Sequence, residues 1–108
     1  MLTRRKFCGC LAAAVPTMAT AVYAQPGCAV FTAERQKTTV PEQAIGLLKE
    51  GNERLVAGKP IHCDHLAQVK ETSAGQAPFA VIAGCIDSRV PPELVFDQGI
   101  GDIFCARR

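Results

Sequence analysis

A continuous apolar run at residues 79–84 is the feature that most constrains the fold of this chain. Its length fits a strand, and the absence of polar alternation is typical of a parallel strand buried on both faces. Two prolines at the start of residues 91–96 predict a short helix, because proline fits a first helical turn. Residues 103–106 predict a second strand. This order predicts an α/β fold, the front part of a mainly parallel sheet with flanking helices.

A longer helix is expected before the first strand. Residues 41–58 carry apolar side chains at approximate helical spacing, with Pro41 at the first helical position and Gly58 as the stop. The pair Gly51-Asn52 interrupts this pattern. We therefore expect the helix to bend or break at that pair.

Two further segments complete the coarse organisation. Asp64 is a suitable N-cap for a second helix over residues 64–72. Residues 25–40 contain proline, glycine, threonine and scattered charges, so they are expected to form an exposed N-terminal arm. Residues 41–108 are then expected to be the N-terminal portion of a larger and incomplete domain, because the chain stops within a predicted central strand.

The first 24 residues have the organisation of an export signal. A basic front precedes an alanine-rich apolar stretch, and Val22 and Ala24 place small residues before a cleavage site. Residues 3–7 (Thr-Arg-Arg-Lys-Phe) resemble the twin-arginine export box. An amphipathic helix is the alternative, but no acidic residue occurs before Glu34. We expect residues 1–24 to be a twin-arginine signal peptide and the protein to be periplasmic or exported.

The charge balance argues against a polyanionic partner. The whole chain of 108 residues has a formal net charge of +2, and the predicted signal carries three of its basic residues. The remainder is close to neutral, so nucleic acid is not expected as a partner. No apolar run reaches the ~18 residues of a spanning helix, so no stable membrane span is expected after removal of the signal.

Six cysteines in so short a chain need an explanation. Four follow the predicted signal: Cys28, Cys63, Cys85 and Cys105. Two disulfides with three possible pairings are one interpretation. Export of an already folded protein by the twin-arginine route favours a metal site instead. The residues His62, Cys63 and His65 offer metal donors at close spacing, although a solvated loop at a helix start explains them better.

The segment from Cys85 to Arg89 combines a thiol, a carboxylate and a guanidinium. A thiolate at the end of a strand is a soft ligand suited to Zn²⁺. Arg89 beside Asp87 can hold the carboxylate ionised and oriented. On this spacing alone, an ordinary loop after a buried cysteine is the better explanation.

The wider stretch resembles the β-class carbonic anhydrases. The similarity runs from about Pro41 to Arg107 and rests on these residues: Gly51 to Gly58, Gly75 to Pro78, Cys85 to Glu93, Phe96-Asp97, Gly99 to Phe104 and Ala106-Arg107. The resemblance implies that Cys85 is a zinc ligand and that Asp87 and Arg89 form the catalytic pair. It also implies that Gln76 and Phe104 line the substrate cleft at a dimer interface.

The same resemblance implies a zinc-dependent lyase, a carbonate dehydratase, that reversibly hydrates carbon dioxide to bicarbonate. It further implies a homodimer or a higher homo-oligomer. The two remaining zinc ligands of that family come from a His-x-x-Cys motif that has no counterpart here, so a fragment is expected. Two alternatives stay open: an inactive exported remnant without zinc, and a small exported metal or disulfide module that uses His62, Cys63, His65 and Cys105.

Overall fold

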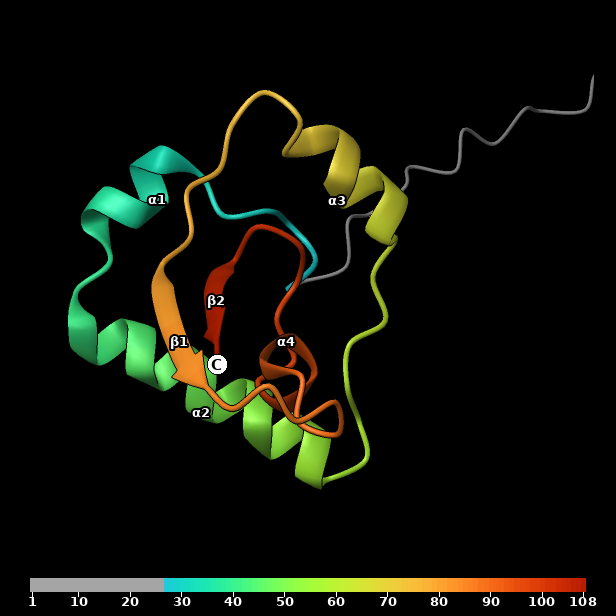
Figure 1. Cartoon of the computed structure of the whole chain (residues 1–108). Helices are drawn as coiled ribbons and strands as arrows, with labels where there is room; N and C mark the ends of the chain where they lie inside the picture. The colour runs from blue at the N-terminus through green and yellow to red at the C-terminus, as the bar shows by residue number, and fades with distance from the viewer. Residues whose placement is uncertain (1–26) are drawn as a thin grey trace, which may run out of the picture.

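The computed structural model describes residues 27–108. The predicted signal peptide, residues 1–24, lies outside the described residues. The elements are α1 (Ala33–Thr38), α2 (Pro41–Val56), α3 (His65–Glu71), β1 (Ala80–Gly84), α4 (Pro92–Val95) and β2 (Ile103–Arg107). Figure 1 shows the two strands side by side with α2 running across their lower ends. The expected α/β order of strand, short helix and strand is confirmed.

The two strands form a parallel pair. The register runs from Ala80 opposite Ile103 to Gly84 opposite Arg107. Both strands therefore end at the same edge of the sheet, which is the edge that Cys85 follows.

The expectation of a strand buried on both faces is wrong for the described residues. The paired side chains of Val81 and Phe104 are 64% and 45% exposed. Successive side chains of a strand point to opposite faces. One face of this two-stranded sheet is therefore open to solvent, while Ile103 is buried on the other.

Helix α2 is continuous through Gly51-Asn52, so a break at that pair is wrong. Gly51 is buried against the turn that follows α4, and a Cβ atom there would lie 1.7 Å from the Phe96 carbonyl oxygen. Asn52 donates from Nδ2 to the Val95 carbonyl at 2.9 Å. The glycine therefore permits close approach of two segments rather than a break in the helix.

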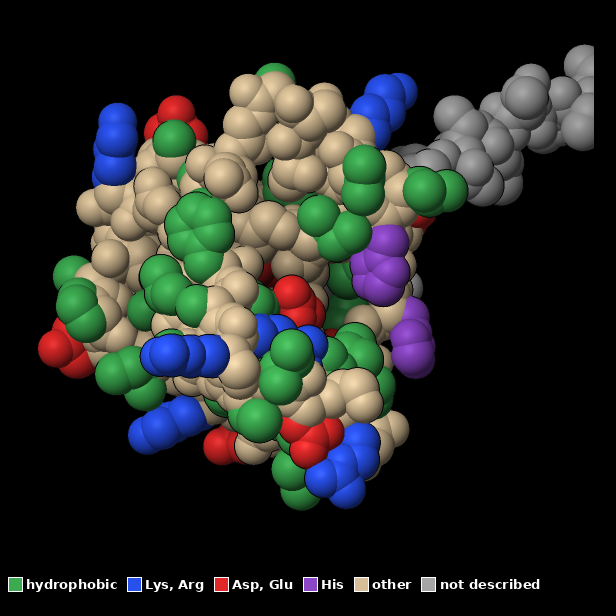
Figure 2. All heavy atoms as spheres, in the orientation of Figure 1, with side chains coloured by type: hydrophobic (Ala, Val, Ile, Leu, Met, Phe, Trp, Pro, Cys, Tyr) green, Lys and Arg blue, Asp and Glu red, His purple; other side chains and the backbone are tan. Residues whose placement is uncertain are grey.

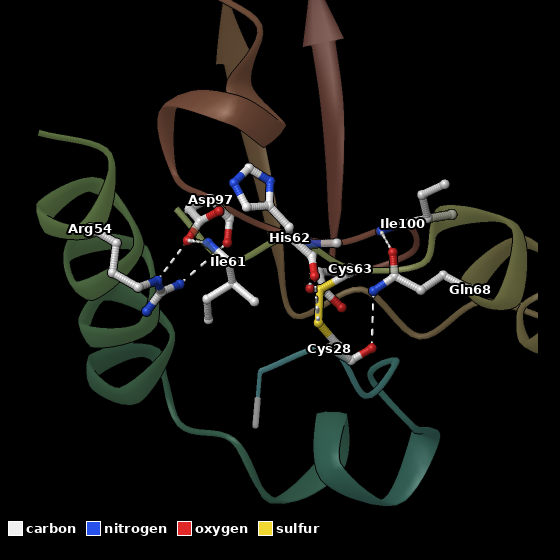
Figure 3. The surroundings of a disulfide bond; sticks show 10 residues. Cys28, Arg54, Ile61, His62, Cys63, Gln68, Asp97 and Ile100 are labelled. Carbon is white, nitrogen blue, oxygen red and sulfur yellow. Dashed lines mark hydrogen bonds and ion pairs between the residues drawn. A yellow bond between two sulfur atoms is a disulfide. The ribbon is translucent and has the colours of Figure 1, made fainter. Parts of the chain in front are cut away.

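An ion pair holds the end of α2 on the same turn. Arg54 Nε lies 2.6 Å from Asp97 Oδ2, and that oxygen also accepts the Ile61 backbone N–H at 3.1 Å (Figure 3). Asp97 has a φ of 47°, in the left-handed region that aspartate tolerates better than most residues. One carboxylate thus joins α2, the loop after it and the turn after α4.

The N-terminal segment differs from a simple exposed arm. Residues 32–38 are exposed, and most of them form α1. Phe31 is only 7% exposed, and its ring centroid lies 4.9 Å from that of Phe79. Gln36 Nε2 donates to the Pro78 carbonyl at 2.6 Å. The segment is therefore anchored on the residues that lead into β1.

A disulfide links Cys28 and Cys63, which corrects the preference for a metal over disulfides (Figure 3). Gln68 is 4% exposed and reinforces the link. Its Nε2 donates to the Cys28 carbonyl at 3.0 Å, and its Oε1 accepts the Ile100 N–H at 3.2 Å. The segment before α1, helix α3 and the turn before β2 are thus held together.

Helix α3 begins where the sequence predicts. The Asp64 side chain accepts the Ala67 N–H at 3.1 Å, as an N-cap does. The two histidines, His62 and His65, lie exposed on the surface (Figure 2). The disulfide removes Cys63 as a thiolate donor, so the metal alternative loses one of its ligands. Over residues 27–108, no helix has the length and apolarity needed to cross a membrane.

Candidate active site

The candidate site lies at the carboxyl ends of the parallel strands. Cys85 follows β1 directly, and its thiol is free and exposed. Reactive groups of open α/β sheets gather at this edge because loops leave the strands there. Residues 85–91 form no helix or strand, and both backbone and side-chain hydrogen bonds hold them.

The Asp87 carboxylate is held by Arg89 through both of its oxygens. Arg89 Nε donates to Oδ1 at 3.1 Å, and Nη2 donates to Oδ2 at 2.8 Å. The Arg89 backbone N–H also donates to Oδ1 at 2.8 Å. These hydrogen bonds, first those of the side chain and then that of the backbone, hold the pKa of Asp87 below its ordinary value, with a smaller contribution from the charge of Arg107.

The Asp87–Arg89 pair is open to solvent on the Arg89 side. The Arg89 side chain is 86% exposed, whereas that of Asp87 is 28% exposed. The carboxylate is therefore ionised and oriented but still reachable. Its two oxygens have lone pairs left to accept a hydrogen bond from a further polar group.

Arg107 was given no role by the sequence reasoning, yet it contacts this loop from the neighbouring strand. Its Nε donates to the Cys85 carbonyl at 3.2 Å, and its Nη2 donates to the Asp87 carbonyl. The available signal was its position directly after the second predicted strand, residues 103–106, because the carboxyl ends of parallel strands share one edge.

The other two candidate residues do not join this group. Gln76 is exposed and precedes β1, so it lies at the opposite end of that strand from Cys85. Phe104 pairs with Val81, about 13 Å along the strand from Cys85 at ~3.3 Å per residue. Of the site residues predicted from the sequence, the described part of the chain places Cys85, Asp87 and Arg89 in one loop and leaves Gln76 and Phe104 away from it.

The described residues do not form a complete metal site. A catalytic zinc is normally held by three protein ligands. Among residues 27–108, no group of three or more histidine, cysteine or acidic side chains is placed to hold a metal. Cys85 suits the role of one ligand, and the set is not completed within this region.

Cys105 is a poor candidate for a metal ligand or a nucleophile. Burial raises the pKa of its thiol to about 11, and a hydrogen bond and the negative charge of Glu93 act in the same direction. A thiol with so high a pKa is protonated at neutral pH, and the thiolate is the reactive form. The exposed Cys85 is therefore the better placed of the two free thiols.

Comparison with known proteins shows which class of protein this segment is similar to. The sequence model of the carbonic anhydrase family matches residues 80–108, which include Cys85, Asp87, Arg89, Phe104 and Arg107. The match confirms the resemblance, and this chain is related by sequence to the β-class carbonic anhydrases.

Individual relatives agree with this class. Carbonic anhydrase 2 of Mycobacterium tuberculosis is 55% identical over 73 residues, which cover 64% of this chain and 34% of the relative. A carbonic anhydrase of Mycolicibacterium smegmatis is 46% identical over 68 residues, which cover 62% of this chain and 33% of the relative. The chain therefore spans about a third of the length of the curated relatives it matches.

Proposed function

We propose that this chain contributes to a zinc-dependent carbonate dehydratase, which reversibly hydrates carbon dioxide to bicarbonate. The observation that carries the proposal is the grouping of a free, exposed Cys85 with an Asp87 carboxylate bound at both oxygens by Arg89. All three residues lie in the segment that matches the carbonic anhydrase family.

Each of the three residues has a separate role in the proposal. Cys85 supplies one thiolate ligand for zinc. Asp87 accepts a hydrogen bond from water and orients it, and Arg89 keeps the carboxylate ionised and fixed in direction. The chemistry supplied by zinc, when bound, is the acidification of a water molecule so that hydroxide is available near neutral pH.

We further propose that the working form is a homodimer or a higher homo-oligomer. Gln76 and Phe104 are assigned to the substrate cleft, but Gln76 lies at the far end of β1 from Cys85. A second copy can bring its own Gln76 to the Cys85 end of the first. The exposed apolar side chains of Val81 and Phe104 are suited to such an interface.

Export to the periplasm is also a proposal, with two supporting observations. Residues 1–24 have the basic front, apolar stretch and cleavage site of a signal peptide. The disulfide between Cys28 and Cys63 is of the kind that persists in oxidising compartments. Replacing both Arg4 and Arg5 with lysine is expected to retain the protein in the cytoplasm, measured by cell fractionation. Unchanged export would refute the twin-arginine assignment.

Zinc content and carbon dioxide hydration test the proposed activity together. Binding of about one zinc per chain, together with carbon dioxide hydration in a stopped-flow indicator assay, would support the proposal; both require ligands beyond those that residues 27–108 supply. Cys85→Ser is expected to lose both properties, whereas the control Cys105→Ser is expected to keep them. Asp87→Asn should keep zinc and lose most of the activity, because an amide is neutral and a weaker acceptor.

The same measurements identify the alternatives. A wild-type chain with neither zinc nor hydration activity would favour the inactive exported remnant. Zinc that survives Cys85→Ser and is lost in His62→Ala would favour the small metal module instead.

A further inference from the structure

Arg107 reaches from one strand to the loop that follows the other. It is the last residue of β2 and is paired in register with Gly84, the last residue of β1. Its guanidinium donates to two backbone carbonyls, those of Cys85 and Asp87. Both bonds are made by a side chain, so they are additional to the backbone bonds between the two segments, the last of which join Arg108 to Gly84 and Ile86.

The geometry of a guanidinium suits this task. Its N–H groups form a rigid planar fork, so two acceptors that it binds are held at a fixed separation. The positive charge also strengthens both hydrogen bonds relative to neutral donors. The two acceptors here are two residues apart, and they belong to the thiol-bearing residue and the carboxylate-bearing residue of the candidate site.

The two arginines act on different parts of Asp87. Arg89 binds the carboxylate, whereas Arg107 binds the backbone carbonyl. The same carbonyl also accepts the Val90 N–H at 3.2 Å, which closes the turn containing Arg89. Substitution of Arg107 is therefore expected to shift the position of the Asp87–Arg89 pair relative to Cys85.

We propose that Arg107 is a positioning residue that sets the spacing between Cys85 and Asp87 at the proposed hydration site. This inference rests on the proposed function for its catalytic meaning. The hydrogen bonds of Arg107 go to the backbone of the loop and not to the Asp87 carboxylate, on which its charge has only a smaller effect.

Arg108 provides a matched control. Its backbone N–H donates to the Gly84 carbonyl at 3.1 Å, and its carbonyl accepts the Ile86 N–H at 2.9 Å. Its exposed side chain makes no hydrogen bond to any described residue. Arg108→Met therefore removes one neighbouring positive charge and leaves the loop contacts intact.

Amide hydrogen exchange in the metal-free full chain tests the proposal. Arg89 and Val90 report on the loop because their N–H groups bond to Asp87, and Phe79 reports on the sheet because its N–H donates to the Asp102 carbonyl. In Arg107→Met we expect at least tenfold faster exchange at both loop amides and unchanged exchange at Phe79. Arg107→Lys should give an intermediate effect, and Arg108→Met none.

Two results would overturn the proposal. Loop amides that exchange in Arg107→Met as in the wild type would show that the fork does not hold the loop. Equal acceleration at the loop and at Phe79 would show that Arg107 stabilises the sheet in general. Arg107→Lys keeps the test decisive if the methionine variant does not fold.

The kinetic consequence is measured separately on the zinc-loaded protein. We expect Arg107→Met to lower kcat at least tenfold with little change in KM. A wild type that lacks hydration activity would refute the proposed function, while the exchange data would still show whether Arg107 holds the loop. An active wild type whose kcat is unaffected by Arg107→Met would refute the positioning role alone.

Discussion

Removing the link between Cys28 and Cys63 should lower stability by a predictable amount. The two cysteines are 35 residues apart in the sequence, and the bond restricts the unfolded chain by closing a loop of that size. The chain-entropy relation gives about 4 kcal/mol at 25 °C for a loop of this length. We expect the double variant Cys28→Ser/Cys63→Ser to lose about this much free energy of unfolding.

The assay is urea denaturation followed by far-ultraviolet circular dichroism, with and without a thiol reductant. Reductant should lower the midpoint of the wild type and leave the double variant unchanged. Cys85→Ser in metal-free buffer is the matched control, because its exposed thiol lies outside the disulfide. It is expected to stay within about 0.5 kcal/mol of the wild type.

Loss of the disulfide should also loosen the structure around Cys28. It should free the segment before α1 from Gln68, because the Cys28 carbonyl is the acceptor of the Gln68 amide. The loop-closure reasoning would be refuted if the free energies of unfolding of the wild type and the double variant differed by less than about 1 kcal/mol. The comparison requires that the slope of the free energy against urea concentration is the same for both proteins.

Two further predictions concern buried positions. Gly51→Ala should destabilise the protein by about 2 kcal/mol or more, because the new Cβ would collide with the Phe96 carbonyl oxygen. Gly46→Ala, on the same helix but with open space around it, should instead stabilise by about 0.5–1 kcal/mol in the same urea assay. Burial raises the pKa of Asp102, partly offset by backbone hydrogen bonds and the charge of Arg35. The contribution of Asp102 to the free energy of unfolding is therefore greatest below its ordinary pKa and falls as the pH rises through the raised pKa. The wild type should lose stability relative to Asp102→Asn between pH 3 and pH 7. A difference in stability that stays constant over this range would contradict the prediction.

Local patterns in the sequence were enough to predict several elements. The N-cap at Asp64, the first turn at Pro41 and the apolar run before Cys85 each depend on neighbouring residues, and the structure confirms all three elements. The pairing of Asp87 with Arg89 is also local, since the two residues are two positions apart in the sequence.

Contacts between distant segments could not be predicted in this way. The break expected at Gly51 is absent because a segment more than 40 residues later packs against that glycine. The pairing of Cys28 with Cys63 depends on how α3 and the N-terminal segment fold back, which cysteine spacing alone does not specify. Arg107 reaches the Cys85 loop only because the two strands are parallel.

The anchoring of α2 and of the N-terminal segment on later parts of the chain has a consequence for the folding rate. Gln36 bonds to Pro78 and Arg54 to Asp97, at separations of 42 and 43 residues. A high proportion of such distant contacts raises the contact order, and folding slows because long loops must close before these contacts form. The α2 helix can form early, but it has no fixed place until the turn after α4 exists. The disulfide between Cys28 and Cys63 joins the segment before α1 to the loop before α3 even before the turn after α4 has formed. The oxidised chain should therefore fold faster than the reduced one.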